Sequence, residues 1–239
     1  MALVSQQTLR RDAFSGFPDP DAAIQFFLEL QAEQNRAWFA AHRADYERLC
    51  RRPLELLMAE LRARLADVYP GLAAVEPHIF RIQRDTRFAR DKSPYKTNVA
   101  ASLPLRAGPP GSDGHAIPSL YLNFGLDGEV VAAGCWHLPP ERLGRYRAAV
   151  AAGPGAALQR IVDGLVSGGW ALASMEALKR VPAPYPADHP RGELLKRKGL
   201  AVSHQPADGL SATPAFADWA AARLGEAAPL LAWLDQHVA

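Results

Sequence analysis

The sequence contains few cysteines, little net charge and no long apolar run. Cys50 and Cys135 are its only cysteines, and their spacing fits neither a zinc site nor a disulfide framework. Lys and Arg exceed Asp and Glu by 27 to 25, a balance too mild to indicate nucleic-acid binding by itself. The longest apolar stretches, such as Ala22 to Leu30, contain polar residues and are too short to cross a bilayer. We therefore expect no metal, no cofactor and no membrane contact.

Signatures of secretion and of several enzyme classes are also missing. The first twenty residues hold no basic segment followed by an apolar one, so we expect a cytoplasmic protein. There is no G-x-S-x-G, no Walker loop and no G-x-G-x-x-G, and the histidines lack the H-x-x-x-H spacing of zinc enzymes. These absences leave the reaction and the oligomeric state open.

Length and composition fit a single globular domain. Hydrophobic residues make up 49% and charged residues 22% of the chain, which is close to the average for proteins with a continuous core. A length of 239 residues lies within the range of one domain. We expect one α+β domain over residues 1–239, with 1–15 as a flexible N-terminal segment because it shows no periodicity.

The first third of the chain has the period of helices. Asp19 or Asp21 can cap a helix that has Pro20 in its first turn, and Pro53 can open a later one. The apolar positions expected on three successive helices are Ile24, Phe27 and Leu28, with Phe26 and Leu30 beside them; Trp38, His42, Tyr46 and Leu49; and Leu54, Leu57, Met58, Leu61 and Leu65.

The middle of the chain changes to the period of strands, and mixed elements follow. Asp127-Gly128 is typical of a tight hairpin turn. The expected strands are His78 to Asp85, Asn98 to Leu105, Leu120 to Phe124, Val130 to Trp136, Ser174 to Leu178 and Leu200 to His204. The expected later helices are Glu141 to Ala151, Ala156 to Ser167, Arg191 to Arg197, and Thr213 to His237 with a kink at Pro229. This order predicts an α+β fold with N-terminal helices packed on a mainly antiparallel sheet and further helices in the C-terminal half.

Positive charge is concentrated between Arg81 and Lys96, where six basic residues accompany two acidic ones. Strand alternation puts Arg81, Gln83 and Asp85 on one face, and three polar side chains cannot all enter an apolar core cheaply. Arg offers a planar fork for phosphate or carboxylate, and Lys a mobile charge. We predict an anion-binding cleft for a phosphorylated metabolite or nucleotide, with Asp85 and Asp91 fixing the arginines. Its basic and phenolic residues are Arg81, Arg84, Arg87, Lys92, Tyr95 and Lys96.

Two other interpretations of the same stretch stay open. The alternation of Arg and Asp also allows an internal ion-pair network in a structural or protein-interaction domain. The basic surface could equally bind nucleic acid, with Tyr95 or Trp136 as a stacking platform.

A second basic group follows near residue 180. Lys179 and Arg180 could fold beside Arg81 to make a two-sided anion clamp. If the site is catalytic, Asp91 or His189 would carry the proton, because a carboxylate in the loop and an imidazole next to Asp188 are the candidate acid–base groups there.

The stretch from Arg84 to Lys96, RDTRFARDKSPYK, resembles the RDxRFxxDKxPYK signature of a widespread family of uncharacterised proteins, a domain of unknown function. The similarity extends to Asn35-Arg36-Ala37-Trp38-Phe39, to Gly134-Cys135-Trp136 and to Leu178-Lys179-Arg180-Val181-Pro182, and it covers nearly the whole chain from Phe17. One departure is Ala183-Pro184, where the family pattern has Lys-Gly. The resemblance implies membership and no activity, but recurring polar residues at these positions favour a ligand site over a structural network.

Overall fold

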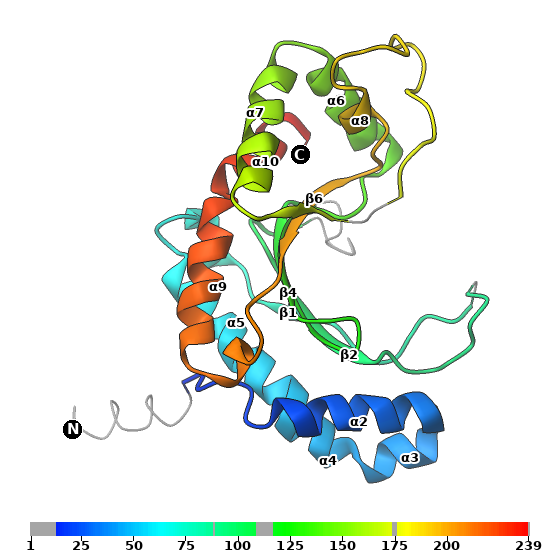
Figure 1. Ribbon diagram of the computed structural model, residues 1–239, viewed down its shortest axis with the longest axis vertical. Coiled ribbons are helices and arrows are strands. Elements are labelled where there is room, and N and C mark those ends of the chain that lie inside the picture. Colours follow the sequence, from blue (N-terminus) through cyan, green and yellow to red (C-terminus); the bar gives the residue numbers. More distant parts are fainter. Residues whose placement is uncertain (1–12, 88, 109–116, 174–175, 239) are drawn as a thin grey trace.

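The computed structural model describes residues 13–87, 89–108, 117–173 and 176–238. It contains an antiparallel six-stranded sheet in the order β1-β2-β3-β4-β6-β5, and helices in both halves of the chain (Figure 1). The strands are β1 (His78–Ile79), β2 (Asn98–Pro104), β3 (Ser119–Gly125), β4 (Val130–Cys135), β5 (Ala171–Leu172) and β6 (Leu200–His204). The α+β prediction is confirmed.

The chain enters the fold through two capped helices. Helix α2 (Pro20–Glu33) begins at Asp19, whose carboxylate accepts a hydrogen bond from the Ala22 amide at 2.9 Å. Helix α3 (Arg36–Ala41) is capped in the same way by Asn35. The buried face of α2 differs from the prediction at Leu28, which is 47% exposed, whereas Phe26 and Leu30 are buried as expected. The ring of Phe26 packs against Trp38 and Tyr46, and this rotates the helix so that Leu28 faces water.

The second expected helix is divided at His42, and its later part forms one continuous rod with the third. Helix α4 (Arg43–Tyr46) passes through a π-helical segment, η1 (Glu47–Arg51), into α5 (Arg52–Arg64). Pro53 was expected to open a separate helix. It is accommodated because the wider π turn, in which the Arg52 amide bonds the Glu47 carbonyl, changes the hydrogen-bonding pattern just before the residue that lacks an amide hydrogen. The five leucine and methionine positions predicted on α5 and at its end are buried, as expected.

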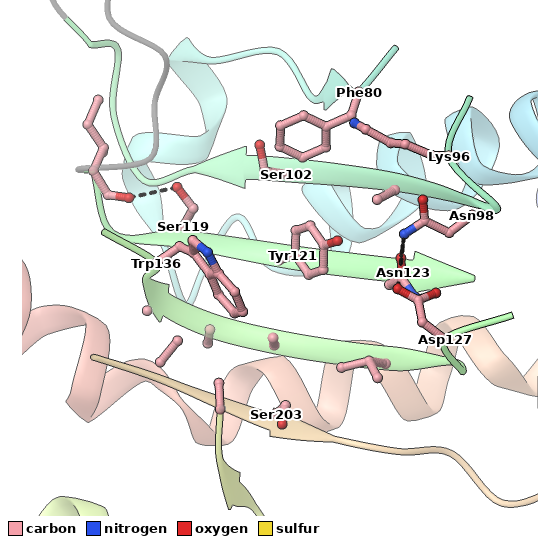
Figure 2. Close-up of a pocket in the computed structure, with 18 residues that line it drawn as sticks. Phe80, Lys96, Asn98, Ser102, Ser119, Tyr121, Asn123, Asp127, Trp136 and Ser203 are labelled. Atoms are coloured by element: carbon pink, nitrogen blue, oxygen red, sulfur yellow. Dashed lines mark hydrogen bonds between the residues drawn. The ribbon is translucent and has the colours of Figure 1, made fainter. Parts of the chain in front are cut away.

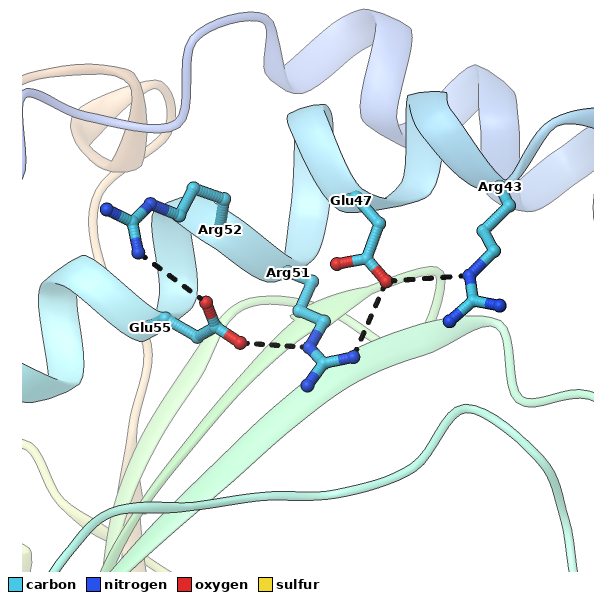
Figure 3. A network of polar contacts seen from close by, with 5 residues as sticks. All are labelled: Arg43, Glu47, Arg51, Arg52 and Glu55. Carbon is cyan, nitrogen blue, oxygen red and sulfur yellow. Dashed lines mark hydrogen bonds and ion pairs between the residues drawn. The ribbon is translucent and has the colours of Figure 1, made fainter.

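The outer face of this rod carries a ladder of ion pairs (Figure 3). Glu47 lies between Arg43 and Arg51, and Glu55 lies between Arg51 and Arg52, with nitrogen–oxygen distances from 2.9 to 3.9 Å. Pairs as exposed as these contribute about 0.3–0.5 kcal/mol each. The arginines of this helix are therefore compensated by glutamates and do not form a free basic surface.

After η2 (Pro70–Ala74) the chain enters the edge strand β1, which is much shorter than the predicted His78 to Asp85. The Phe80 amide still bonds the Ala100 carbonyl of β2. The chain then pairs with itself, because the Arg84 amide bonds the Pro94 carbonyl at 2.9 Å and the Lys96 amide bonds the Ile82 carbonyl at 2.8 Å. Residues 84–96, here called the basic loop, thus project from the end of the sheet.

Strands β2, β3, β4 and β6 lie close to their predicted positions. Gly128, in the turn between β3 and β4, has a φ of 102°, as the Asp-Gly turn requires. Strand β5 begins at Ala171, earlier than the expected Ser174, and residues 174 and 175 lie outside the described part of the chain. Farther on, Ala177 forms an isolated bridge with Arg197. The segment between β2 and β3 is described only at its two ends.

The C-terminal half adds α6 (Pro140–Ala151), α7 (Pro154–Ser167), α8 (Gly192–Leu195), η3 (Leu210–Ala212), α9 (Ala215–Glu226) and α10 (Ala228–Val238). The terminal helix was predicted as one helix with a kink at Pro229, and it is instead two helices separated at Ala227. Pro229 explains the break, since it lacks the amide hydrogen that a continuous helix would need and is tolerated in the first turn of α10.

The helices leave one face of the sheet uncovered. Helices α2, α5, α9 and α10 contact strands β2, β3 and β4, and Val99, Ala101 and Leu103 of β2 are buried toward them. Figure 1 shows α5 and α9 along one side of the sheet, whereas among the described residues no helix lies across the other side. One connected hydrophobic core runs from Phe14 to Val238.

Candidate functional site

The uncovered face of the sheet is hollowed into a cavity of about 690 Å³, here called the sheet-face pocket (Figure 2). Strand alternation supplies its lining, because residues two apart on β2, β3, β4 and β6 point to the same face. The lining residues are Phe80, Lys96, Asn98, Ala100, Ser102, Ile117, Ser119, Tyr121, Asn123, Asp127, Val130, Ala132, Ala133, Gly134, Trp136, Ala173, Ala201 and Ser203. A pocket of this size, mostly apolar with a few polar groups, is typical of small-molecule sites.

The middle of the pocket is flat and its borders are aromatic. Ala132 pairs with Ser203, and Gly134 pairs with Ala201, so small side chains cover β4 and β6. A side chain at Gly134 would meet the Leu200 carbonyl, and its φ of 143° also favours glycine. Tyr121 borders this area on β3, and Trp136 lies at the end of β4 with 58% of its surface exposed. The Trp136 ring thus offers a large apolar surface with a polar N–H at the border of the cavity.

Lys96 supplies positive charge at one side of the pocket. Its ammonium lies 5.5 Å from the centroid of the Phe80 ring, and among the described residues no carboxylate lies within ion-pair distance of it. Burial, and then the charge of Arg81, lower the pKa of Lys96. Arg81 is exposed and has no ion pair within the described part of the chain. Two neighbouring cations that form no ion pair among the described residues make this side of the pocket attractive to an anion.

A polar network lies beside Lys96. Asn123 is buried, and its amide nitrogen donates to the Asp127 carboxylate at 2.9 Å and to the Gly128 carbonyl at 2.8 Å. Asn98 donates to Asn123 Oδ1 at 2.6 Å and to the Asp127 carboxylate at 3.2 Å. These bonds join β2, β3 and the hairpin turn, and they hold two amides at the pocket surface.

The basic loop is linked internally by its own acids. Arg84 forms an ion pair with Asp91, and Arg87 forms one with Asp85 at 2.7 Å. The bonds from Arg87 lower the pKa of Asp85 to about 2. Phe88 of the family signature lies outside the described residues. Two of the arginines predicted to bind an anion thus already have carboxylate partners.

Lys92 and Ser93 complete these internal contacts. The Lys92 ammonium donates to the Thr86 carbonyl at 2.8 Å. Ser93 donates to the Asp91 carboxylate through its hydroxyl at 2.7 Å and its amide at 2.9 Å, and these bonds, together with Arg84, hold the pKa of Asp91 well below its usual value. A carboxylate stabilised in this way is a weak base, which disfavours Asp91 as a proton carrier.

Tyr95 belongs to the core rather than to the surface. Its ring is buried and stacks on Phe39 at 4.6 Å, and its amide donates to the Gln34 side chain. The Tyr95 backbone also bridges to Gln83. Tyr95 therefore anchors the base of the basic loop against α2 and α3.

The second basic group lies at the other edge of the sheet. Lys179 and Arg180 follow β5, whereas Arg81 follows β1, and the four remaining strands separate these two edges. Neither is among the described residues that line the sheet-face pocket. His189 accepts a hydrogen bond from the Arg191 amide through Nδ1 at 3.0 Å, within a loop that contacts α6 through Arg191. The structure thus does not bring His189 or the second basic group to the pocket.

Of the residues predicted from the sequence, Lys96 lines the pocket and Arg81 acts on it electrostatically. Sequence reasoning missed Asn98, Tyr121 and Asn123. The available signal was alternation, because Ser119, Tyr121 and Asn123 alternate with apolar residues along β3 and indicate one wet face of an antiparallel sheet.

Among the described residues, no group of three or more His, Cys, Asp and Glu side chains could hold a metal ion. Cys50 and Cys135 are buried, and burial raises the pKa of each thiol to about 12. Among the helices described, none is both long and apolar enough for a membrane span.

The arrangement defines an α+β protein with helices on one face of an antiparallel sheet and a pocket on the other. The family model described as conserved hypothetical protein (DUF2461) matches residues 22–233, and the chain belongs to this family. Membership, predicted from the sequence, is confirmed. No curated protein and no solved structure matches the chain.

Proposed function

We propose that this protein binds a small anionic metabolite, a phosphate ester such as a sugar phosphate or a nucleotide, in the sheet-face pocket. The observation that carries the proposal is Lys96, a half-buried ammonium at the pocket with no carboxylate partner in the described residues. The ammonium group is partly shielded from water, so its attraction to an incoming anion would be stronger there than at the open surface. Arg81 adds a second positive charge from the edge of the sheet.

The expected affinity follows from the number of charged contacts. A charge-assisted hydrogen bond contributes about 1.5–3 kcal/mol, and association costs several kcal/mol in lost freedom. Two such contacts, together with apolar burial against Tyr121 and Trp136, support dissociation constants between about 1 μM and 1 mM. This range suits a metabolite site.

The basic loop has a supporting role in this proposal. Asp85 and Asp91 hold Arg87 and Arg84, so these groups shape the loop at the edge of the sheet. We place the protein in the cytoplasm, in keeping with a chain that has only two cysteines, both of them buried.

A thermal-shift screen tests the proposal. Inorganic phosphate, sugar phosphates and nucleotides are each added to the full chain, and we expect a concentration-dependent rise in Tm, which corresponds to about 2.7 kcal/mol at one hundred times Kd. Lys96→Met keeps the length of the side chain and should abolish the rise. Arg90→Met, which removes one positive charge from the basic loop, should preserve it. No rise with any phosphate, or an equal rise in Lys96→Met, contradicts the proposal.

A second candidate function is single-stranded nucleic-acid binding on the same face. It is favoured by three aromatic residues, Phe80, Tyr121 and Trp136, on an open antiparallel sheet beside a lysine. It predicts affinity for oligonucleotides that falls steeply with salt. Binding of mononucleotides that equals binding of oligonucleotides would favour the metabolite site instead.

A further inference from the structure

Asn98 and Lys96 point to the same face of the chain as it enters β2. They are two residues apart, so their Cα atoms lie about 7 Å from each other along an extended strand. A ligand whose anionic group meets the Lys96 ammonium therefore has its neighbouring atoms within reach of the Asn98 amide. What that amide offers depends on which of its two ends faces the pocket.

The hydrogen bonds around Asn123 fix this orientation. The Gly128 carbonyl can only accept, so the Asn123 atom bonded to it at 2.8 Å is the amide nitrogen. The other end of the Asn123 amide is then the oxygen, and it accepts from Asn98 at 2.6 Å. Asn98 must donate this bond through its nitrogen, which also reaches the Asp127 carboxylate.

The Asn98 oxygen is left for the pocket. Figure 2 shows the Asn98 nitrogen toward Asn123 and the oxygen pointing away, on the side of Lys96. Among the described residues no donor is bonded to this oxygen. The pocket thus presents one cation and one fixed hydrogen-bond acceptor side by side.

We infer that Asn98 is a specificity-determining residue that accepts a hydrogen bond from the ligand, so that the ligand is a phosphate ester with a hydroxyl or amino group close to its phosphate. This inference rests on the proposed function, since Lys96 positions the phosphate. Asn123, Asp127 and the Gly128 carbonyl act as positioning groups that keep the acceptor outward. An ester without a donor would leave the Asn98 oxygen without a partner when the ligand displaces water.

Two esters with the same three-carbon skeleton test the inference. Glycerol 3-phosphate carries two hydroxyls and propyl phosphate carries none, and the affinity of each for the full chain is measured by calorimetric titration. We expect glycerol 3-phosphate to bind about two- to tenfold more tightly, the range of one hydrogen bond between neutral groups. Asn98→Ala should remove the difference, whereas Thr97→Ala, at the residue just before β2 and outside the pocket lining, should retain it.

The outcomes distinguish a failure of the proposed role of Asn98 from a failure of the proposed function. Equal affinities for the two esters, both lost in Lys96→Met, overturn the role of Asn98 and leave the proposed function standing. Affinities that do not depend on Lys96, or no binding of either ester, overturn the proposed function and the role of Asn98 with it. Comparing the two esters in the unmodified protein keeps the test decisive even if Asn98→Ala, which leaves Asn123 Oδ1 without its donor, does not fold.

Discussion

Lys96 keeps a charge where the charged form is disfavoured. Its pKa is lowered by burial and by Arg81, so the unfolded chain binds the proton more tightly than the folded chain does. The corresponding destabilisation is fully present at pH values below the lowered pKa. Stability then rises as the pH rises through the lowered pKa toward the ordinary value for lysine, since the folded state loses its proton first. A residue that costs stability in the absence of ligand is best explained by what it binds.

The ligand-free stability of Lys96→Met tests this explanation. Methionine fills the same space next to the Phe80 ring without a charge, so we expect the midpoint of urea unfolding at neutral pH to increase. Arg90→Met is the matched control and should leave the midpoint nearly unchanged, because Arg90 is exposed. A decrease in Lys96→Met would show that Lys96 is a structural residue whose partners stabilise the fold.

At the scale of elements, the basic loop is held by short-range contacts of exposed groups. The pKa of Asp85 falls from its ordinary 3.8 to about 2 because Arg87 donates to its carboxylate, and the pKa of Asp91 is also lowered by Ser93 and Arg84. Carboxylates with depressed pKa values stabilise the folded loop at pH values above the unfolded pKa, and this contribution disappears as the pH falls through the folded pKa. The loop should therefore be most ordered above about pH 4.

Amide signals of the loop, followed by NMR between pH 6 and about pH 2, check this dependence. We expect the Arg87 amide, which donates to Asp85, and the Ser93 amide, which donates to Asp91, to shift together with protonation of their acceptors. Asp85→Asn should remove the titration of the Arg87 amide and leave that of Ser93. Global stability should change little, because the ion pairs are exposed. A titration close to pH 4 for both amides would contradict these contacts.

The bounds of helices, turns and strands were predicted correctly where neighbouring residues determine them. They were missed where contacts with distant segments of the chain determine them. The cap of α2 at Asp19 and the turn at Gly128 depend on one or two residues, and both were predicted. The length of β1 depends on the hydrogen bonds that residues 82–84 form with residues 94–96. The alternation of polar and apolar residues does not show which segments will pair in this way. The site was missed for the same reason, since Asn98 and Asn123 meet only through the register of β2 with β3.

For the whole molecule, the connected core predicts cooperative unfolding. Buried residues from α2, α5, the sheet, α7 and α10 belong to one hydrophobic cluster, so neither half keeps its apolar surface covered without the other. We expect one calorimetric transition with a van't Hoff enthalpy equal to the measured enthalpy. Two separated transitions would show that the N-terminal and C-terminal halves fold independently, contrary to the single domain expected from the sequence.

The order of the strands also bears on how the chain is made. Strand β6 lies between β4 and β5, although β5 is translated nearly thirty residues earlier. A nascent chain that has not yet released residues 200–204 from the ribosome therefore leaves the edge of β4 unpaired and β5 without a neighbour. Unpaired edges of this kind attract other chains. The growing polypeptide is thus most exposed to aggregation just before residues 200–204 emerge, and this is the stage at which a chaperone would be of most use to it.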